Sequence, residues 1–364
     1  MKKSKQIGIL LCAAVYLALA FAAWILPAKG ESLWERRALR QKPAATVKTV
    51  LDGSFMTAFD AAAQDQFPLR DGFRTLKALS SRYVFRQKDN NGVYLLNGYA
   101  SKLEYPYSTR SGSRALELMQ KVCDAYFASG SGKAVIAVVP DKNYYLAPAG
   151  NYPEMDYAAL FSQMQAQDFA EFVDLRDCLS LDSYYRTDTH WRQEALLPAA
   201  RKLASALGTE VPPFTETTLD TPFYGVYRGQ AALPMAPDSL VLLENDVLNG
   251  CTVKNLEAGE TGTVYDLGKL SGRDPYDVYL SGAVSLLEIT NPAGDPEKTL
   301  VLFRDSFGSS LAPLLVPGYG RVILADLRYM PGRLLENYVE DIADADVLFL
   351  YSTLVLNSSA LLKW

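Results

Sequence analysis

The sequence predicts an α/β fold in which a mostly parallel sheet is flanked by helices, with an N-terminal transmembrane helix and a β-containing insertion. Apolar runs of four to six residues recur at 134–139, 299–303, 322–325 and 347–351, and amphipathic helical stripes alternate with them. Strands that are apolar on both sides are typical of parallel sheets whose two faces are covered by helices. This pattern is the main argument for the fold class.

The helical stripes separate the predicted strands. We expect helices around residues 116–127, 156–168, 195–207 and 334–342. Because Pro198 lies inside the third stripe, that helix either begins near residue 195 or kinks at the proline.

The N-terminal segment predicts a single membrane span. Residues 7–26 are twenty consecutive apolar or small residues, and a helix of that length extends about 30 Å, the thickness of a bilayer core. Lys2, Lys3 and Lys5 precede the run, so the positive-inside rule places the N-terminus in the cytoplasm and the rest of the chain outside the cell membrane. A cleaved signal peptide, whose apolar region is usually ~7–15 residues, and lipid attachment at Cys12 are the alternatives.

The composition divides the chain into three parts. Residues 1–28 form the cytoplasmic N-terminus and the transmembrane anchor, residues 29–100 a helical lead-in segment, and residues 101–364 the α/β domain. Within the last part, residues 209–298 turn to Pro, Gly, Thr and Tyr. That composition predicts an irregular insertion with short strands that lies outside the core.

Charge and cysteine usage exclude several classes of function. Four of the 36 Lys and Arg fall within residues 1–29, so the rest of the chain carries 32 against 41 Asp and Glu. An acidic surface repels a phosphate backbone, which argues against a nucleic-acid partner. The three cysteines beyond the span show no C-x-x-C spacing, so neither a disulfide framework nor a zinc cluster is indicated. Without a glycine-rich phosphate loop or a metal-ligand cluster, we expect no cofactor and no metal.

His190 is the single histidine of the chain, which excludes any mechanism that needs two imidazoles from one subunit. Asp188 precedes it by two residues, and at this spacing in an extended loop both side chains project to the same side. A carboxylate beside an imidazole accepts the Nδ1 proton and leaves Nε2 free as a base. Taken alone, the pair also fits a capping aspartate next to a surface histidine.

Ser306 directly follows the apolar run 299–303. In open α/β sheets functional groups gather at the carboxyl ends of strands, and the small Gly308 lets a substrate carbonyl approach backbone N–H donors. A serine becomes a good nucleophile only when a base takes its proton, and the chain supplies one imidazole. We therefore expect Asp188, His190 and Ser306 to form a catalytic triad, although a simple helix cap also explains the serine.

Three further polar residues are expected at the same rim of the sheet. Lys142 follows the predicted strand 134–139, and Arg328 with Tyr329 follows 322–325. Each of them can orient a substrate or stabilise an anion at that edge. For Lys142 and Arg328, a solvated charge at a strand end is the alternative.

The two motifs Tyr185–Trp191 and Arg304–Gly308 together resemble the bacterial DHHW protein family and its relatives, the AlgX/AlgJ-type polysaccharide O-acetyltransferases. The resemblance covers most of residues 60–330, because it extends to Asp65–Asp71, Pro140–Lys142 and Asp326–Tyr329. It implies an SGNH-hydrolase-like fold with a serine-histidine-aspartate triad. It also implies extracytoplasmic acetyl transfer to a polysaccharide, often with a membrane-bound acyltransferase supplying the acetyl group.

The sequence departs from the family pattern at two places. Thr189 stands at the second position of the D-H-H-W motif, which leaves Asp188 and His190 aligned. The asparagine that SGNH enzymes use in the oxyanion hole has no clear counterpart directly after the run 347–351, where Ser352-Thr353-Leu354 stands. Backbone N–H groups or Arg328 would have to donate the hydrogen bonds that stabilise the oxyanion.

The sequence therefore predicts a membrane-anchored, extracytoplasmic serine acyltransferase. We expect it to O-acetylate or deacetylate an exopolysaccharide or cell-wall glycan through an acyl-Ser306 intermediate; an acetylesterase is a variant of the same chemistry. The alternative is a non-catalytic glycan-binding or export scaffold that retains the fold. The absent asparagine and the unexplained insertion 209–298 favour that alternative.

Overall fold

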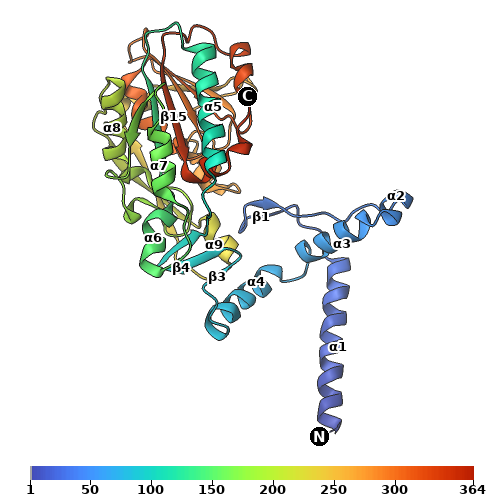
Figure 1. The fold of residues 1–364 in the computed structure, drawn as a ribbon. Helices are drawn as coiled ribbons and strands as arrows, with labels where there is room; N and C mark the ends of the chain where they lie inside the picture. Colours follow the sequence, from blue (N-terminus) through green and yellow to red (C-terminus); the bar gives the residue numbers. More distant parts are fainter. Residues whose placement is uncertain (1) are drawn as a thin grey trace. The chain divides into compact units, whose positions relative to one another are not determined.

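The computed structural model describes residues 2–364, apart from the side chains of Lys2, Lys3 and Trp24 (Figure 1). The orientation argument based on Lys2 and Lys3 therefore lies outside the described side chains and stays a prediction. The chain forms two compact units. The smaller unit runs to Asn91 and includes residues 228–234, and the larger unit holds residues 92–227 and 235–364.

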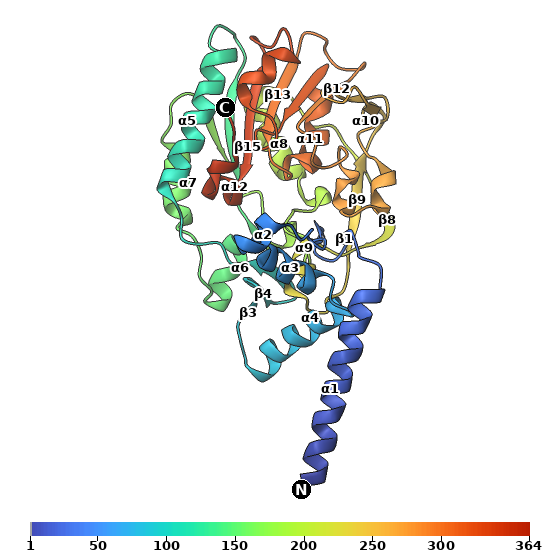
Figure 2. The ribbon, with the colours of Figure 1, turned by 90° about the vertical axis from the view of Figure 1, so that its right-hand side faces the viewer.

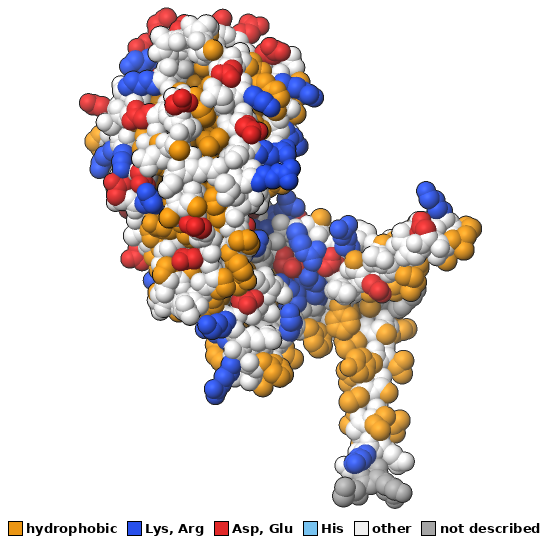
Figure 3. Space-filling view, viewed as in Figure 1, with side chains coloured by type: hydrophobic (Ala, Val, Ile, Leu, Met, Phe, Trp, Pro, Cys, Tyr) orange, Lys and Arg blue, Asp and Glu red, His pale blue; other side chains and the backbone are white. Residues whose placement is uncertain are grey.

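Helix α1 (Lys2–Ile25) opens the smaller unit. Its stretch Ser4–Ala23 is long and apolar enough to cross a membrane, and none of that stretch is buried. Hydrophobic side chains cover its surface (Figure 3). By length and composition, α1 fits either a single-pass membrane anchor or a signal peptide.

The rest of the smaller unit consists of short elements held by ion pairs. Asp65 accepts two hydrogen bonds from the guanidinium of Arg37, at 2.6 and 2.8 Å, and one from the N–H of Arg40 at 2.9 Å. The Arg37 guanidinium lowers the pKa of Asp65 to about 2. The elements are β1 (Glu31–Ser32), β2 (Arg37–Ala38), α2 (Val47–Leu51), α3 (Ser54–Asp65), α4 (Arg70–Leu79), the π-helical turn η1 (Ser80–Val84) and β3 (Asp89–Asn90).

The larger unit is built on an eight-stranded sheet with the order β11-β10-β12-β14-β13-β15-β6-β7. The five strands from β14 to β7 are parallel, and the three strands at the other edge are antiparallel. The predicted α/β class with a mostly parallel sheet is therefore confirmed. The parallel strands are β6 (Ala134–Val139), β7 (Glu171–Asp174), β13 (Thr299–Arg304), β14 (Arg321–Ala325) and β15 (Asp346–Ser352).

Both faces of this sheet are buried because successive side chains of a strand point to opposite sides. Within β6, Ile136 and Val138 pack on one face, whereas Val135 and Ala137 pack on the other. Helices α5 (Thr109–Tyr126) and α7 (Tyr157–Gln165) cover the first face; α8 (Leu197–Leu207) and α11 (Gly308–Leu315) cover the second (Figure 2). Each fully buried Val or Leu adds about 1.5–3 kcal/mol to stability.

Two helical predictions differ in detail from the structure. α8 begins at Leu197 with Pro198 in its first turn, so the helix starts at the proline and does not kink there. The first turn tolerates proline because its N–H would have no helical partner. The stripe expected at 334–342 forms only a 3₁₀ helix, η7 (Gly332–Asn337).

The insertion 209–298 was expected to lie outside the core, and this expectation is wrong for three of its strands. β10 (Thr252–Asn255), β11 (Thr261–Gly262) and β12 (Leu286–Thr290) belong to the central sheet. β12 pairs antiparallel with β14, and its Leu286, Leu287 and Ile289 are buried. A separate hairpin precedes them, formed by β8 (Thr215–Phe223) and β9 (Asp238–Glu244).

The remaining elements of the larger unit are a second hairpin and short helical segments. The hairpin β4 (Val93–Leu96) and β5 (Tyr99–Lys102) packs against α6 through Tyr94 and Leu146. The other elements of the unit are α6 (Lys142–Gly150), α9 (Val226–Ala231, at the boundary between the units), α10 (Asp246–Asn249), α12 (Thr353–Asn357) and the 3₁₀ turns η2 (Leu181–Ser183), η3 (Gln193–Ala195), η4 (Leu267–Ser271), η5 (Pro275–Val278), η6 (Val316–Gly318) and η8 (Ser359–Leu361).

Candidate active site

Ser306 lies on the turn between β13 and α11, at the carboxyl end of a central strand. Asp305 holds this turn: its Oδ1 accepts the Phe307 N–H at 3.0 Å, and its Oδ2 accepts the Ser352 N–H of β15 at 2.8 Å. Asp305 is buried, whereas Ser306 is only half-buried. The turn therefore presents the serine hydroxyl at the sheet edge on a rigid backbone.

His190 lies on an irregular loop, residues 184–191, which we call the histidine loop. An isolated antiparallel β-bridge between Tyr184 and Trp191 closes this loop. Within the loop, the Tyr185 N–H donates to the His190 carbonyl at 3.1 Å. The indole Nε1 of Trp191 donates to the Phe307 carbonyl at 3.0 Å. This last contact ties the histidine loop directly to the turn that carries Ser306, although the two are more than a hundred residues apart in the sequence.

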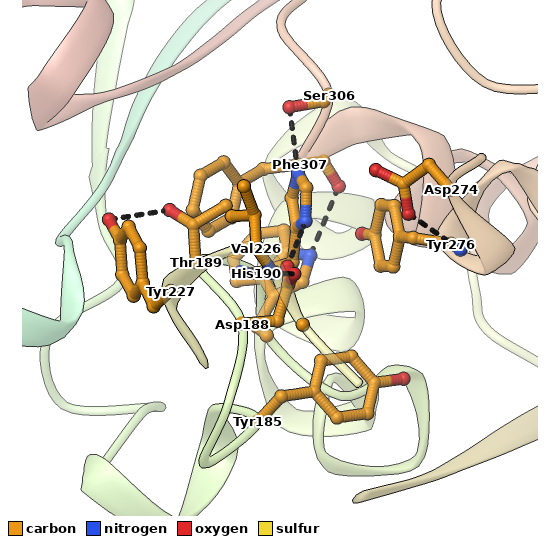
Figure 4. Close-up of polar contacts among 12 residues, drawn as sticks. Tyr185, Asp188, Thr189, His190, Val226, Tyr227, Asp274, Tyr276, Ser306 and Phe307 are labelled. Carbon is orange, nitrogen blue, oxygen red and sulfur yellow. Dashed lines mark hydrogen bonds and ion pairs between the residues drawn. The ribbon is translucent and has the colours of Figure 1, made fainter. Parts of the chain in front are cut away.

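The structure brings Asp188, His190 and Ser306 into one hydrogen-bonded row (Figure 4). Asp188 Oδ1 lies 2.6 Å from His190 Nδ1, and His190 Nε2 lies 2.8 Å from Ser306 Oγ. Because a carboxylate accepts but does not donate, the proton of the neutral imidazole is on Nδ1. Nε2 then presents its lone pair to the serine hydroxyl, which is the arrangement of a general base beside a nucleophile.

Asp188 is completely buried, and its second oxygen is also used. Oδ2 accepts the Val226 N–H at 2.8 Å, and the His190 N–H donates to Oδ1 at 3.1 Å. Gly225 passes close behind the aspartate, because a Cβ on Gly225 would lie 2.4 Å from the Asp188 Cα. The insertion thus supplies both a hydrogen-bond donor and close packing behind the carboxylate.

A second carboxylate, that of Asp238 in the insertion, holds the backbone of the same loop. Asp238, the first residue of β9, accepts the N–H groups of Arg186 and Thr187 at 2.9 and 2.8 Å. Its Oδ2 also accepts the Thr187 hydroxyl at 2.5 Å. Three hydrogen bonds from one carboxylate hold the backbone just before Asp188.

Tyr276 of η5 stacks face to face on the His190 ring (Figure 4). The ring centroids are 3.9 Å apart and the planes differ by 5°. The Tyr276 hydroxyl is 2.7 Å from Ser310 Oγ, which in turn accepts the Trp191 indole N–H at 2.9 Å. The imidazole is therefore held in plane by the stack and at both ring nitrogens by hydrogen bonds.

Lys142 does not reach the solvent at the rim; it is fully buried beneath the histidine loop. Its Nζ donates to the carbonyl oxygens of Tyr185 and Asp188, both at 2.6 Å, and lies 3.4 Å from the Arg186 carbonyl oxygen. Burial lowers the pKa of this amine to about 7, against the opposing effect of the Asp188 carboxylate. Lys142 therefore holds the backbone of the histidine loop in place through hydrogen bonds to its carbonyl groups.

The other rim candidates lie apart from the triad or are already hydrogen-bonded. Arg328 binds Asp326 at 2.7 and 2.9 Å, and Tyr329 is 52% exposed beside it. The Gly308 N–H donates to the Asp305 carbonyl at 3.1 Å. A Cβ on Gly308 would lie 2.6 Å from the Arg304 Cβ, so close packing accounts for this glycine.

Sequence reasoning missed three residues of the insertion: Val226 and Tyr276, which contact Asp188 and His190, and Asp238, which holds the backbone just before Asp188. None of them lies in a local pattern that signals chemistry. Tyr276 follows Asp274-Pro275, a sequence typical of turns. In the structure the Tyr276 N–H donates to the Asp274 side chain at 3.0 Å. Only the folded arrangement places them against residues 186–190.

The chain is similar in sequence to a probable alginate O-acetylase AlgJ of Pseudomonas syringae, with 26% identity over 193 residues. That match covers 49% of this chain and 49% of the relative, so the chain spans about half the length of the curated relative it matches. No protein-family model matches the sequence.

Two solved structures share the fold. A DHHW family protein from Eubacterium siraeum superposes with a TM-score of 0.61 and 18% identity, over 74% of this chain and 93% of that one. PatB1 of Bacillus cereus, solved with a sulfonyl adduct, superposes with a TM-score of 0.55 and 15% identity, over 72% of this chain and 95% of that one. The predicted resemblance to DHHW proteins and AlgJ is confirmed at the level of fold and partial sequence.

Proposed function

We propose that this protein is a serine acyltransferase that moves an acetyl group to a hydroxyl of an exopolysaccharide or cell-wall glycan through an acyl-Ser306 intermediate. The observation that carries the proposal is the 2.8 Å contact between His190 Nε2 and Ser306 Oγ, with Asp188 at 2.6 Å from the other ring nitrogen. The similarity to a probable alginate O-acetylase supports acetyl transfer as the reaction. The DHHW-like fold supports an SGNH-hydrolase-like architecture.

In the first half-reaction Ser306 Oγ attacks the carbonyl carbon of the acetyl donor while His190 Nε2 takes the hydroxyl proton. The carbonyl π electrons move to oxygen, and buried Asp188 stabilises the imidazolium that forms. When the tetrahedral intermediate collapses, the donor oxygen leaves with the proton that His190 carried. The products are the free alcohol of the donor and acetyl-Ser306.

In the second half-reaction a sugar hydroxyl attacks the acetyl-Ser306 carbonyl carbon. His190 takes the proton of that hydroxyl and then returns it to Ser306 Oγ as the ester bond breaks. The acetyl group ends on the sugar, and the enzyme regains its starting protonation state. If water replaces the sugar, the same steps release acetate, which is the esterase variant of the reaction.

Backbone groups of the Ser306 turn are the proposed oxyanion donors, because the nearby side chains are occupied. Arg328 is paired with Asp326, and the Thr353 hydroxyl accepts the Asp141 N–H at 3.0 Å. The N–H groups of Phe307 and Gly308 both donate to Asp305. This leaves the Ser306 N–H itself as the candidate donor toward a substrate oxyanion.

The proposed place of action is the outer side of the cell membrane, with α1 as an uncleaved anchor. The proposed acceptor is a polysaccharide, and the acetyl group is proposed to come from a membrane-bound acyltransferase. This setting agrees with the length and apolarity of α1. A polymer made or exported at the membrane would then meet the enzyme there.

The test is formation of the acyl-enzyme. The full chain in detergent is incubated with an aryl acetate, and intact-mass spectrometry follows the addition of one acetyl group. We expect the adduct on wild type, its loss in Ser306→Ala, and turnover slower by at least about 10³-fold in His190→Ala. An aryl sulfonyl fluoride is a second probe, chosen because PatB1 carries a sulfonyl adduct.

Ser309→Ala is the matched control. Ser309 lies three residues after Ser306 and is buried. Its hydroxyl has no hydrogen-bond partner among the residues that the structure describes, so its loss should leave acylation unchanged. Equal acylation of wild type and Ser306→Ala would overturn the proposal and favour the glycan-binding scaffold. Added oligosaccharide separates transferase from esterase, because only a transferase diverts acetyl groups from water to sugar.

A further inference from the structure

One segment of the smaller unit exposes apolar side chains along a helical face. In α4 and η1, Leu76 is 59% exposed, Tyr83 69%, Val84 71% and Phe85 71%. Leu69, at the start of α4, is 76% exposed and lies seven residues before Leu76, on the same side of a helix. Figure 3 shows hydrophobic side chains gathered at the end of this segment, which Figure 1 labels as α4.

The opposite side of the same segment is packed into its own unit. Ala78 is completely buried, and Ser81 is 8% exposed. Arg74 donates to the Gly229 carbonyl at 2.8 Å and lies 3.3 Å from the Glu35 carboxylate. The segment thus has one face packed into its own unit, and its exposed apolar side chains lie outside that packed face.

The charge of this segment is opposite to that of the rest of the chain. Residues 69–88 hold six Lys and Arg and a single acid, Asp71, whereas residues 30–364 as a whole carry 32 basic against 41 acidic side chains. Arg74 is paired with Glu35, but Lys77 and Arg86 are exposed and Arg82 is partly exposed. Apolar side chains bordered by solvent-facing cations form the pattern of a helix that lies on a membrane surface.

We propose that this face of α4 and η1, from Leu69 to Lys88, binds the surface of a bilayer that contains anionic lipid. The cations match the negative headgroup layer, and the apolar side chains enter the boundary between headgroups and acyl chains. The same unit carries α1, the one helix among the described residues that is long and apolar enough to span a membrane. The interaction does not depend on the proposed acetyl transfer; it requires that α1 keeps the chain at a membrane.

Such a contact gives the chain a second attachment besides α1. A lone helix leaves the following residues free to swing, whereas a surface-bound segment 45–60 residues later restrains the smaller unit against the bilayer. Each lysine or arginine near an anionic surface strengthens binding by about fivefold, and the effect falls off within a Debye length. The binding should therefore depend on both the lipid charge and the salt concentration.

Amide hydrogen exchange of the full chain tests the proposal. The protein is placed in nanodiscs of phosphatidylcholine alone or with about 30% phosphatidylglycerol, and in detergent. We expect residues 80–88 to exchange at least about fivefold more slowly in the anionic discs than in the neutral ones. This readout does not involve catalysis, so an inactive Ser306→Ala chain should give the same result, and failure of either proposal is visible separately.

Two variants and a control sharpen the experiment. Lys77→Gln/Arg82→Gln/Arg86→Gln should remove the dependence on lipid charge, and Tyr83→Ser/Val84→Ser/Phe85→Ser should give fast exchange in both lipids. The control Val50→Ser/Leu51→Ser removes exposed apolar residues of α2 in the same unit and should leave residues 80–88 protected.

Three outcomes would overturn the proposal. Equal exchange of wild type in the two lipids would exclude recognition of anionic headgroups. Equal protection in detergent would mean that the segment needs no charged bilayer surface for its protection. Protection that appears only after a partner protein is added would assign the face to that partner.

Discussion

The turn of Ser306 and the loop of His190 reach the same point of the molecule by different means. The turn is the direct continuation of β13, and one neighbouring residue, Asp305, satisfies its backbone. The loop has little regular structure of its own, and Lys142, Asp238 and the Val226 N–H hold it from three other segments. The proposed nucleophile is positioned by its own strand, whereas the proposed base is positioned by the rest of the domain.

This difference predicts how each half of the site responds to mutation. A change in the turn alters local backbone hydrogen bonds next to a rigid sheet. A change among the supports of the loop alters the position or tautomer of the imidazole, even where the changed residue touches no substrate. Replacing a support of the loop should therefore cost more activity than stability, whereas replacing Asp305, the support of the turn, should cost more stability than activity.

Asp188→Asn should give the largest effect. The amide supplies one acceptor where the His190 Nδ1–H and the Val226 N–H now find two. An amide N–H facing Nδ1 favours the tautomer with the proton on Nε2, which cannot take a proton from Ser306. We expect kcat for aryl acetate hydrolysis to fall roughly 10³–10⁴-fold with little change in KM.

Asp305→Asn is the comparison for that variant. Both Asp305 oxygens also accept backbone N–H groups, but neither touches the imidazole. We expect a lower melting temperature and a fall in kcat of about tenfold or less. If Asp305→Asn were as inactive as Asp188→Asn, the distinction between turn and loop would be broken.

The same distinction explains what the sequence could and could not predict. The strand cores 134–139 and 299–303 were correct to within one residue, because continuous apolar runs report burial on both faces. Ser306 could be placed since a strand end is a local feature. The placement of β12 in the central sheet could not be predicted, because its apolar run is short and its partner β14 lies beyond β13 in the sequence.

The supports of the histidine loop escaped prediction for the same reason. Tyr276 lies 86 residues beyond His190 in the sequence, and its stacking depends on how the insertion folds over the loop. Lys142 was expected at the rim because it follows a strand, but its long side chain turns inward to backbone carbonyl groups. Sequence spacing gives the place of a Cα atom but not the direction of a flexible side chain.

Lys142→Met tests the support beneath the loop. Methionine is similar in length but donates no hydrogen bond, so the carbonyl groups of Tyr185 and Asp188 lose their partner in a buried place. We expect kcat to fall by about 10²-fold through misplacement of His190. KM for a small aryl acetate should change little, because Lys142 is buried beneath the loop and its amine donates to backbone carbonyl groups.

The control for that variant is Lys202→Met. Lys202 also donates to a backbone carbonyl, that of Asp174 at 2.7 Å, but it lies on α8 beside the exposed Asp177. Its removal should leave kcat unchanged. A Lys142→Met enzyme with normal kcat would show that Asp238 and Val226 alone suffice to hold the loop.

Two variants of Tyr276 should have smaller effects on kcat, and comparing them separates the contribution of stacking from that of hydrogen bonding. Tyr276→Leu removes the ring that lies 3.9 Å from the imidazole, and Tyr276→Phe removes only the hydroxyl next to Ser310. Aromatic pairs contribute about 0.5–1.5 kcal/mol, so we expect kcat to fall by up to about tenfold in the leucine variant and by about twofold or less in the phenylalanine variant. Equal losses in both would assign the effect to the Ser310 contact.

The last prediction concerns stability and not kcat: the buried Lys142 beneath the loop should give the protein a pH-dependent free energy of unfolding. The pKa of Lys142 is about 7 in the folded protein, against 10.5 for an ordinary lysine, because burial disfavours the charged amine. Between these two values the unfolded chain binds more protons than the folded one, so stability rises with pH across this window. Below about pH 7 both states are protonated, and this dependence disappears.

Denaturant titrations of wild type and Lys142→Met at about pH 7 and pH 9 isolate the contribution, because the other titrating groups are common to both proteins. Between the two pH values, we expect the free energy of unfolding of wild type to increase by roughly 1–3 kcal/mol more than that of the variant. Parallel profiles would mean that Lys142 keeps its proton in the folded state, stabilised by the carbonyl oxygens at 2.6 Å and the nearby Asp188 carboxylate. In that event the loop rests on a permanent buried cation, and its support is electrostatic as well as hydrogen-bonded.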